Sequence, residues 1–213
     1  DPLEPPEYDS PLGQRITAGA DGWIRALLAG LPDDRLDEAK ESPDFVGELR
    51  HYQRRGLAWM QFLAEVGLGG CLADDMGLGK TVMLISLHLH RRLNPQTAGP
   101  TLVVCPASVM SVWEAQAAQF CPDLSVLVWT GGRQARRQSF TAGSYDLLVT
   151  HYGLARMEAA LLGSREFTFV ILDEAQAIKN PDALVSRAVK RLHCQHRIAV
   201  TGTPLENKLL DLW

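Results

Sequence analysis

Cysteine is scarce in this chain, with four residues among 213 and no C-x-x-C pair. So few and so scattered thiols argue against a disulfide scaffold, and we expect them to be reduced. Long apolar runs are lacking as well, since no stretch approaches the roughly 18 residues that a membrane-spanning helix needs. The acidic, proline-rich beginning lacks the basic and then apolar order of a signal peptide. These absences predict a protein of a reducing compartment with no membrane partner.

Aromatic residues are also few, at 7%, but the apolar share of 46% is ordinary for a folded domain, so neither disorder nor a collagen-like repeat describes the chain. Positive charge is lacking mainly at the beginning. Residues 1–44 hold 11 acidic and 4 basic side chains, a net −7, whereas residues 45–213 hold 14 and 17, a net +3, in agreement with the overall −4. Residues 1–44 are therefore predicted to be an acidic linker or the end of an upstream domain. Net charge excludes no nucleic-acid partner, because a local positive stripe is enough.

From residue 45 onward, short apolar runs alternate with helical patterns. Most runs are rich in valine, isoleucine and leucine, which is typical of parallel strands buried on both faces. We therefore predict an α/β fold with three layers, in which a mainly parallel sheet carries helices on both faces. The predicted strands are Gly70–Ala73, Leu102–Cys105, Val126–Trp129, Leu147–Thr150, Phe169–Asp173 and Ile198–Thr201. The predicted helices are 50–66, 81–93, 108–120, 151–162 and 183–193, with a short one at 21–29 and another from 205 onward.

One glycine-rich loop, between the first strand and the helix at 81–93, has the pattern of a phosphate-binding loop. Its glycines free backbone N–H groups to turn toward phosphate oxygens. Lys80 would reach the β- and γ-phosphates, and the hydroxyl of Thr81 would bind Mg²⁺. The alternative is a chance glycine-rich turn. The predicted nucleotide-binding residues of this loop are Asp74, Asp75, Met76, Gly77, Leu78, Gly79, Lys80 and Thr81.

Two carboxylates follow the apolar strand at 169–172. Asp173 and Glu174 would lie at the carboxyl edge of the sheet, where ligands bind in open α/β folds. We predict that Asp173 holds Mg²⁺ and that Glu174 orients or deprotonates the attacking water, so that Lys80, Asp173 and Glu174 form the catalytic set. Alone, the pair could equally be a solvated start of a helix, where acidic side chains are favourable.

Two more segments are candidates for the nucleotide site. Thr201–Asn207 follows the last predicted strand and fits either a helix cap or a relay between nucleotide and a second lobe. Gln53 lies 27 residues before Lys80. A glutamine amide can pair with both the donor and the acceptor on the edge of adenine, although a glutamine on a helix is usually a surface residue.

Together these segments resemble the Swi/Snf family of superfamily-two helicase-like ATPases, which are double-stranded DNA translocases. The resemblance rests mainly on the strings Asp74–Thr81 and Val200–Asn207 and covers residues 45–213. It implies the first RecA-like lobe of a P-loop motor with ATP and Mg²⁺ as cofactors, duplex DNA as partner and a second lobe in the same polypeptide. It also implies that Gln53 reads adenine and that residues 1–44 end an upstream helicase-associated region.

By the same resemblance, three turns after strands would track the phosphates of one DNA strand. The expected DNA-contacting residues are Ser108, Gly132, Arg133, Thr150 and Tyr152. Each turn could also be an ordinary strand end. Three arginines of the second turn, Arg133, Arg136 and Arg137, could form either a DNA-facing patch or a solvated helix face. Two tryptophans, Trp59 and Trp113, are predicted to be packing residues.

The chain departs from the family pattern at Gln176, where many members have histidine. A transporter ATPase is disfavoured because no Leu-Ser-Gly-Gly-Gln signature occurs. The remaining alternative is a degenerate lobe that binds protein or DNA without turnover. Arginine outnumbers lysine 16 to 5, which favours a bacterial source. We expect a cytoplasmic, nucleoid-associated protein, or a nuclear one if the source is eukaryotic.

Overall fold

The structure, a computed structural model, describes residues 7–9, 15–17, 39–75, 77–95 and 97–202. The chain divides into two units, residues 1–37 and 38–213. In the first unit, strands β1 (Glu7–Asp9) and β2 (Arg15–Thr17) pair in antiparallel fashion, and neither is among the predicted strands. The helices predicted at 21–29 and from 205 onward lie outside the described residues. Within the described part, no helix is long and apolar enough to span a membrane.

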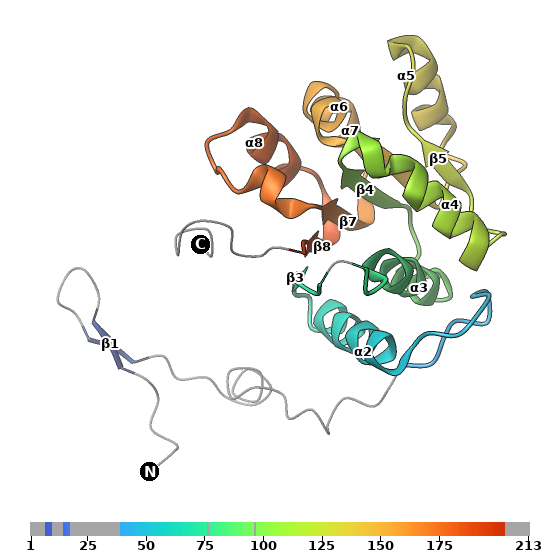
Figure 1. The fold of residues 1–213 in the computed structure, drawn as a ribbon. Coiled ribbons are helices and arrows are strands. Elements are labelled where there is room, and N and C mark those ends of the chain that lie inside the picture. Colours follow the sequence, from blue (N-terminus) through green and yellow to red (C-terminus); the bar gives the residue numbers. More distant parts are fainter. Residues whose placement is uncertain (1–6, 10–14, 18–38, 76, 96, 203–213) are drawn as a thin grey trace. The chain divides into compact units, whose positions relative to one another are not determined.

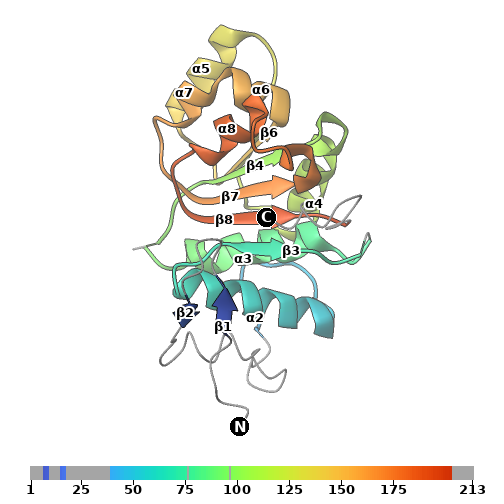
Figure 2. The same cartoon turned by 90° about the vertical axis from the view of Figure 1, so that its left-hand side faces the viewer.

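The second unit is built on a six-stranded sheet in which every pair of neighbours is parallel. All six predicted strands are confirmed. The order β3-β8-β7-β4-β6-β5 places one strand between β3 and β7, and Figure 2 shows β3, β8 and β7 pointing the same way. The strands are β3 (Gly70–Leu72), β4 (Thr101–Cys105), β5 (Val126–Val128), β6 (Leu147–His151), β7 (Phe167–Asp173) and β8 (Cys194–Val200).

Helices cover both faces of this sheet (Figure 1), as predicted. One face packs against α2 (His51–Glu65), α3 (Lys80–Arg92) and α4 (Met110–Phe120), which follows the 3-10 turn η1 (Ala107–Val109). The other packs against α5 (Arg133–Ala142), α6 (Tyr152–Met157), α7 (Ala159–Leu162) and α8 (Leu184–Lys190). The 3-10 turn η2 (Ala175–Ile178) follows β7.

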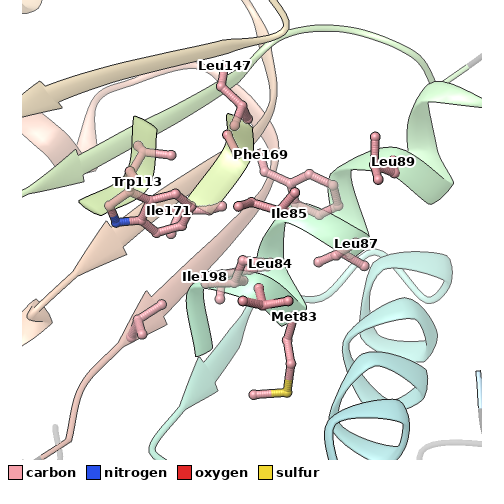
Figure 3. Packing of buried hydrophobic residues seen from close by; sticks show 14 of the residues in the cluster. Met83, Leu84, Ile85, Leu87, Leu89, Trp113, Leu147, Phe169, Ile171 and Ile198 are labelled. Atoms are coloured by element: carbon pink, nitrogen blue, oxygen red, sulfur yellow. The ribbon is translucent and has the colours of Figure 1, made fainter. Parts of the chain in front are cut away.

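The sheet has a hydrophobic core on each of its two faces, and the alternation of side chains along the strands explains this division. Successive side chains of a strand point to opposite faces. Along β4, Val103 therefore belongs to the cluster under α3, shown in Figure 3, while Leu102 and Val104 belong to the cluster under α5–α8. Both β4 and β7 are buried along their whole length, which is why each reads as a continuous apolar run.

Two helical expectations need correction. The helix predicted at 151–162 is broken at Glu158 into α6 and α7. Helix α5 was missing from the predicted helices because its sequence is rich in arginine and glutamine, and it buries only Arg136 and Phe140. A polar helix with two inward side chains has no apolar periodicity to detect.

Candidate nucleotide-binding site

The glycine-rich loop joins β3 to α3, as its sequence pattern predicted. Gly77 and Gly79 have φ angles of +84° and +77°, a conformation that residues with a Cβ adopt reluctantly. A Cβ on Gly79 would also collide with the side-chain amide of Gln53. Both glycines are therefore required by the path of the loop. Met76 lies outside the described residues.

Lys80 is the first residue of α3, and its ammonium group folds back over the loop. Nζ donates hydrogen bonds to the backbone oxygens of Asp74, at 2.7 Å, and Asp75, at 2.9 Å. Both acceptors are uncharged backbone oxygens, so these two hydrogen bonds do not neutralise the charge of the lysine. The start of a helix adds unpaired N–H groups and a favourable dipole, so this corner suits an anion such as a phosphate.

Gln53 is a buried side chain, 9% exposed, which contradicts the alternative of a surface glutamine. Its Oε1 accepts from the N–H of Arg50 at 2.8 Å, and its Nε2 donates to the oxygen of Leu78 at 3.0 Å. The amide thus ties the beginning of α2 to the glycine-rich loop. Its contact with adenine stays a prediction.

Asp173 ends β7 and is 8% exposed, so a solvated surface pair is wrong for this residue. Its Oδ2 accepts from the indole N–H of Trp113 at 2.9 Å, and its Oδ1 accepts from the N–H of Glu174 at 3.0 Å. Burial raises the pKa of the Asp173 carboxyl, while these two N–H donors and the charge of Lys80 counteract that rise. The charge of Lys80, in the other predicted motif, is thus one of the groups that lower the pKa of Asp173.

Glu174 has φ +51° and ψ +54°, and among the described residues it alone combines a side chain with a positive φ. Such a conformation is unfavourable and persists only where the surroundings hold it. Gln176 Nε2 donates to Glu174 Oε2 at 2.6 Å, and Thr201 Oγ1 donates to Gln176 Oε1 at 2.9 Å. The segment that begins at Thr201 is therefore connected to Glu174 through one amide.

The oxygen ligands available at this edge suit Mg²⁺, and they are too few to enclose a metal ion with protein ligands alone. Magnesium is commonly held by one or two carboxylates, with water and substrate phosphates completing its shell. Asp173 and Glu174 are adjacent carboxylates, and Thr81 lies in the first turn of α3. Among the described residues, no group of three or more histidine, cysteine or acidic side chains is arranged to hold a metal ion.

The three turns predicted to contact DNA follow the carboxyl ends of β4, β5 and β6, which are neighbouring parallel strands. Ser108 and Gly132 are exposed, and the side chain of Arg133 is 72% exposed. Tyr152 is half-buried, and its hydroxyl donates to the backbone oxygen of Asp173 at 2.8 Å. Thr150 is 0% exposed, so its side chain cannot contact DNA in this conformation. Thr150 lies within β6, where helices cover both faces of the sheet.

Arg136 contradicts both readings of the arginine cluster, because it is neither solvated nor free to face DNA. It is buried, its guanidinium donates to Glu158 Oε1 at 2.7 Å and to the oxygen of Gly131, and it lies 5.9 Å from the centre of the Trp129 ring. Arg137 is exposed. The sequence held no signal for this pair, because Glu158 lies 22 residues further along the chain.

A lysine-bearing glycine loop, an Asp-Glu pair on a strand two positions away and an all-parallel sheet together define a RecA-like P-loop nucleotide-binding domain. Comparison with known proteins narrows the class. The model of the SNF2-related domain matches residues 52–213, and the chain belongs to this family.

Several relatives carry names that describe motors. YwqA of Bacillus subtilis, named as an ATP-dependent helicase/translocase, is 43% identical over 192 residues, which are 89% of this chain and 20% of YwqA. The chromatin-remodeling ATPase INO80 of Arabidopsis thaliana is 36% identical over 97% of this chain and 14% of its own length. The Sulfolobus solfataricus SWI2/SNF2 ATPase core, solved with double-stranded DNA, is similar with a TM-score of 0.75 and 38% identity, over 83% of this chain and 36% of that one. The chain thus spans a fifth or less of these two curated relatives.

Proposed function

We propose that this chain is the ATP-binding lobe of a motor that hydrolyses MgATP to move along double-stranded DNA or to remodel protein–DNA complexes. The observation that carries the proposal is the shared edge of the sheet. The Lys80 loop, the Asp173–Glu174 pair and the exposed turns all follow carboxyl ends of parallel strands. Ligands of open α/β sheets bind at that edge.

Each group has a role in nucleotide chemistry. The N–H groups of the loop and the ammonium of Lys80 would hold the phosphates, and the hydroxyl of Thr81 with the carboxylate of Asp173 would hold Mg²⁺. When bound, the metal neutralises charge on the phosphates. Glu174 would orient the attacking water and accept its proton, with its carboxylate held by the amide of Gln176.

The DNA contacts would be sequence-independent. Ser108, Gly132 and Arg133 offer hydroxyl, backbone and guanidinium donors, which bind phosphates and carry no sequence information. A second lobe in the same polypeptide would supply arginines that stabilise the transferring phosphoryl group and would close on the first lobe to move the DNA. In a bacterial cell such a motor would work at the nucleoid.

The test measures ATP hydrolysis by the intact protein with duplex DNA, single-stranded DNA and RNA. Duplex DNA of any sequence is expected to stimulate hydrolysis without strand separation. Lys80→Ala should bind ATP about 10- to 150-fold more weakly, because it loses a charge-assisted contact of about 1.5–3 kcal/mol. Lys190→Ala, at an exposed lysine of α8, is the matched control and should behave as wild type.

Two results would contradict the proposal. Stimulation by RNA but not by duplex DNA would indicate an RNA helicase instead. Equal ATP affinity in wild type and Lys80→Ala would indicate that the glycine-rich loop is not the phosphate site and would favour a degenerate lobe.

A further inference from the structure

Trp113 is more than a packing residue. It lies on α4 and is 1% exposed, and its ring lies among the core side chains with its nitrogen turned away from them (Figure 3). That nitrogen donates to Asp173 Oδ2 at 2.9 Å. A tryptophan N–H is a donor only, so it orients a carboxylate without being able to take a proton from it.

The same aspartate is held from a second helix. The hydroxyl of Tyr152, the first residue of α6, donates to the backbone oxygen of Asp173 at 2.8 Å. The N–H of Glu174 occupies the other carboxylate oxygen at 3.0 Å. Asp173 is therefore fixed at both carboxylate oxygens and at its carbonyl, and lone pairs remain on the carboxylate for a cation.

We propose that Trp113 is a positioning residue for Asp173, and that Tyr152 fixes the backbone of the same residue. The inference rests on the proposed function, because it assigns these two hydrogen bonds to the Mg²⁺ side of the nucleotide site. Trp113 lies in the first turn of the α-helix that follows β4 and η1, and Tyr152 directly follows β6. Removal of an orienting partner weakens a metal site because the partner fixes the orientation of the metal ligand.

Trp129 provides a matched control. It is also 1% exposed, and its indole N–H also donates over 2.9 Å to a buried acceptor, the backbone oxygen of Arg136. The substitutions Trp113→Phe and Trp129→Phe therefore remove the same group from equally buried places. Only the first removes it from Asp173.

The experiment titrates the chain with a fluorescent ADP analogue, once with Mg²⁺ and once with a chelator. Trp113→Phe is expected to weaken Mg²⁺-dependent binding about tenfold, as loss of an orienting partner of a metal ligand typically does, and to leave binding in the chelator unchanged. Trp129→Phe should match wild type in both. Tyr152→Phe removes one hydroxyl without opening a large cavity, and it should weaken Mg²⁺-dependent binding severalfold in the absence of DNA.

Several outcomes would overturn the inference. Equal losses in Trp113→Phe and Trp129→Phe would mean that the effect is general destabilisation. Wild-type Mg²⁺ dependence in Trp113→Phe, together with weak binding by Lys80→Ala, would leave the proposed function standing and refute the positioning role. If wild type binds no nucleotide in the presence of Mg²⁺, both the proposed function and the positioning role that rests on it are refuted.

Discussion

At the scale of single residues, Glu174 combines a strained backbone with a side chain held by Gln176. Residues with positive φ cluster at sites where geometry matters more than stability. The amide of Gln176 donates to Glu174 and accepts from Thr201, so the connection carries no titratable group of its own. Glu174 is therefore held by a side chain that cannot change its protonation state.

Glu174→Gln in the intact protein should preserve ATP binding and lower turnover by a factor of about 10² to 10⁴, since the change keeps the size of the side chain and removes the base. Steady-state hydrolysis and nucleotide titration measure the two effects. Glu166→Gln is the control, because Glu166 is exposed and directly precedes the opposite end of β7. If Glu174→Gln turned over ATP within about tenfold of the wild-type rate, Glu174 would not be the catalytic base.

At the scale of elements, the buried Arg136–Glu158 pair holds α5 against the α6–α7 corner. Arg136 also donates to the oxygen of Gly131, just before α5 begins. The pair therefore fixes the turn that presents Arg133. A buried ion pair adds little net stability over an apolar pair, but breaking it leaves a buried charge without a partner.

Glu158→Gln should reduce the free energy of unfolding by about 3–5 kcal/mol, because the guanidinium of Arg136 stays buried without its counterion. The exposed pair of Arg187 and Asp182, with its atoms 3.1 Å apart, is the comparison. Asp182→Asn should change stability by less than about 1 kcal/mol. Urea unfolding of wild type, Glu158→Gln and Asp182→Asn measures the two changes in the free energy of unfolding. Equal changes would show that the Arg136–Glu158 pair is not effectively buried.

At the scale of the whole molecule, binding to duplex DNA by phosphate contacts alone should be strongly salt-dependent. Each phosphate contact contributes about −0.9 to the slope of log affinity against log salt, because counterions are released. Arg133→Ala should flatten that slope by about one and leave sequence preference unchanged. Arg187→Ala, at an exposed arginine of α8, should leave the slope as it is. Fluorescence anisotropy across a salt series measures the slope for wild type and both variants. An unaltered slope in Arg133→Ala would show that Arg133 contacts no phosphate.

The second unit begins at Glu38, before the composition change at residue 45. Glu41 explains the earlier start, since its carboxylate accepts from the N–H of Leu49 at 2.7 Å and pairs with Arg54 at 3.0 Å. These two hydrogen bonds attach Glu41 to Leu49, just before α2, and to Arg54, in its first turn. Composition cannot report such contacts, because they depend on where the partner side chain lies.

The sequence by itself determined the strands, the α/β class, the glycine-rich loop and the Asp173–Glu174 edge, because these depend on local periodicity and short motifs. Only the tertiary structure decided what surrounds them. It buried Arg136, expected on a DNA-facing patch or a solvated helix face, and Thr150, which the family resemblance placed against DNA, and it gave Trp113 a carboxylate 60 residues away. The physical reason is the parallel sheet, which brings the ends of distant strands to one edge, so that hydrogen bonds form between side chains that no local pattern relates.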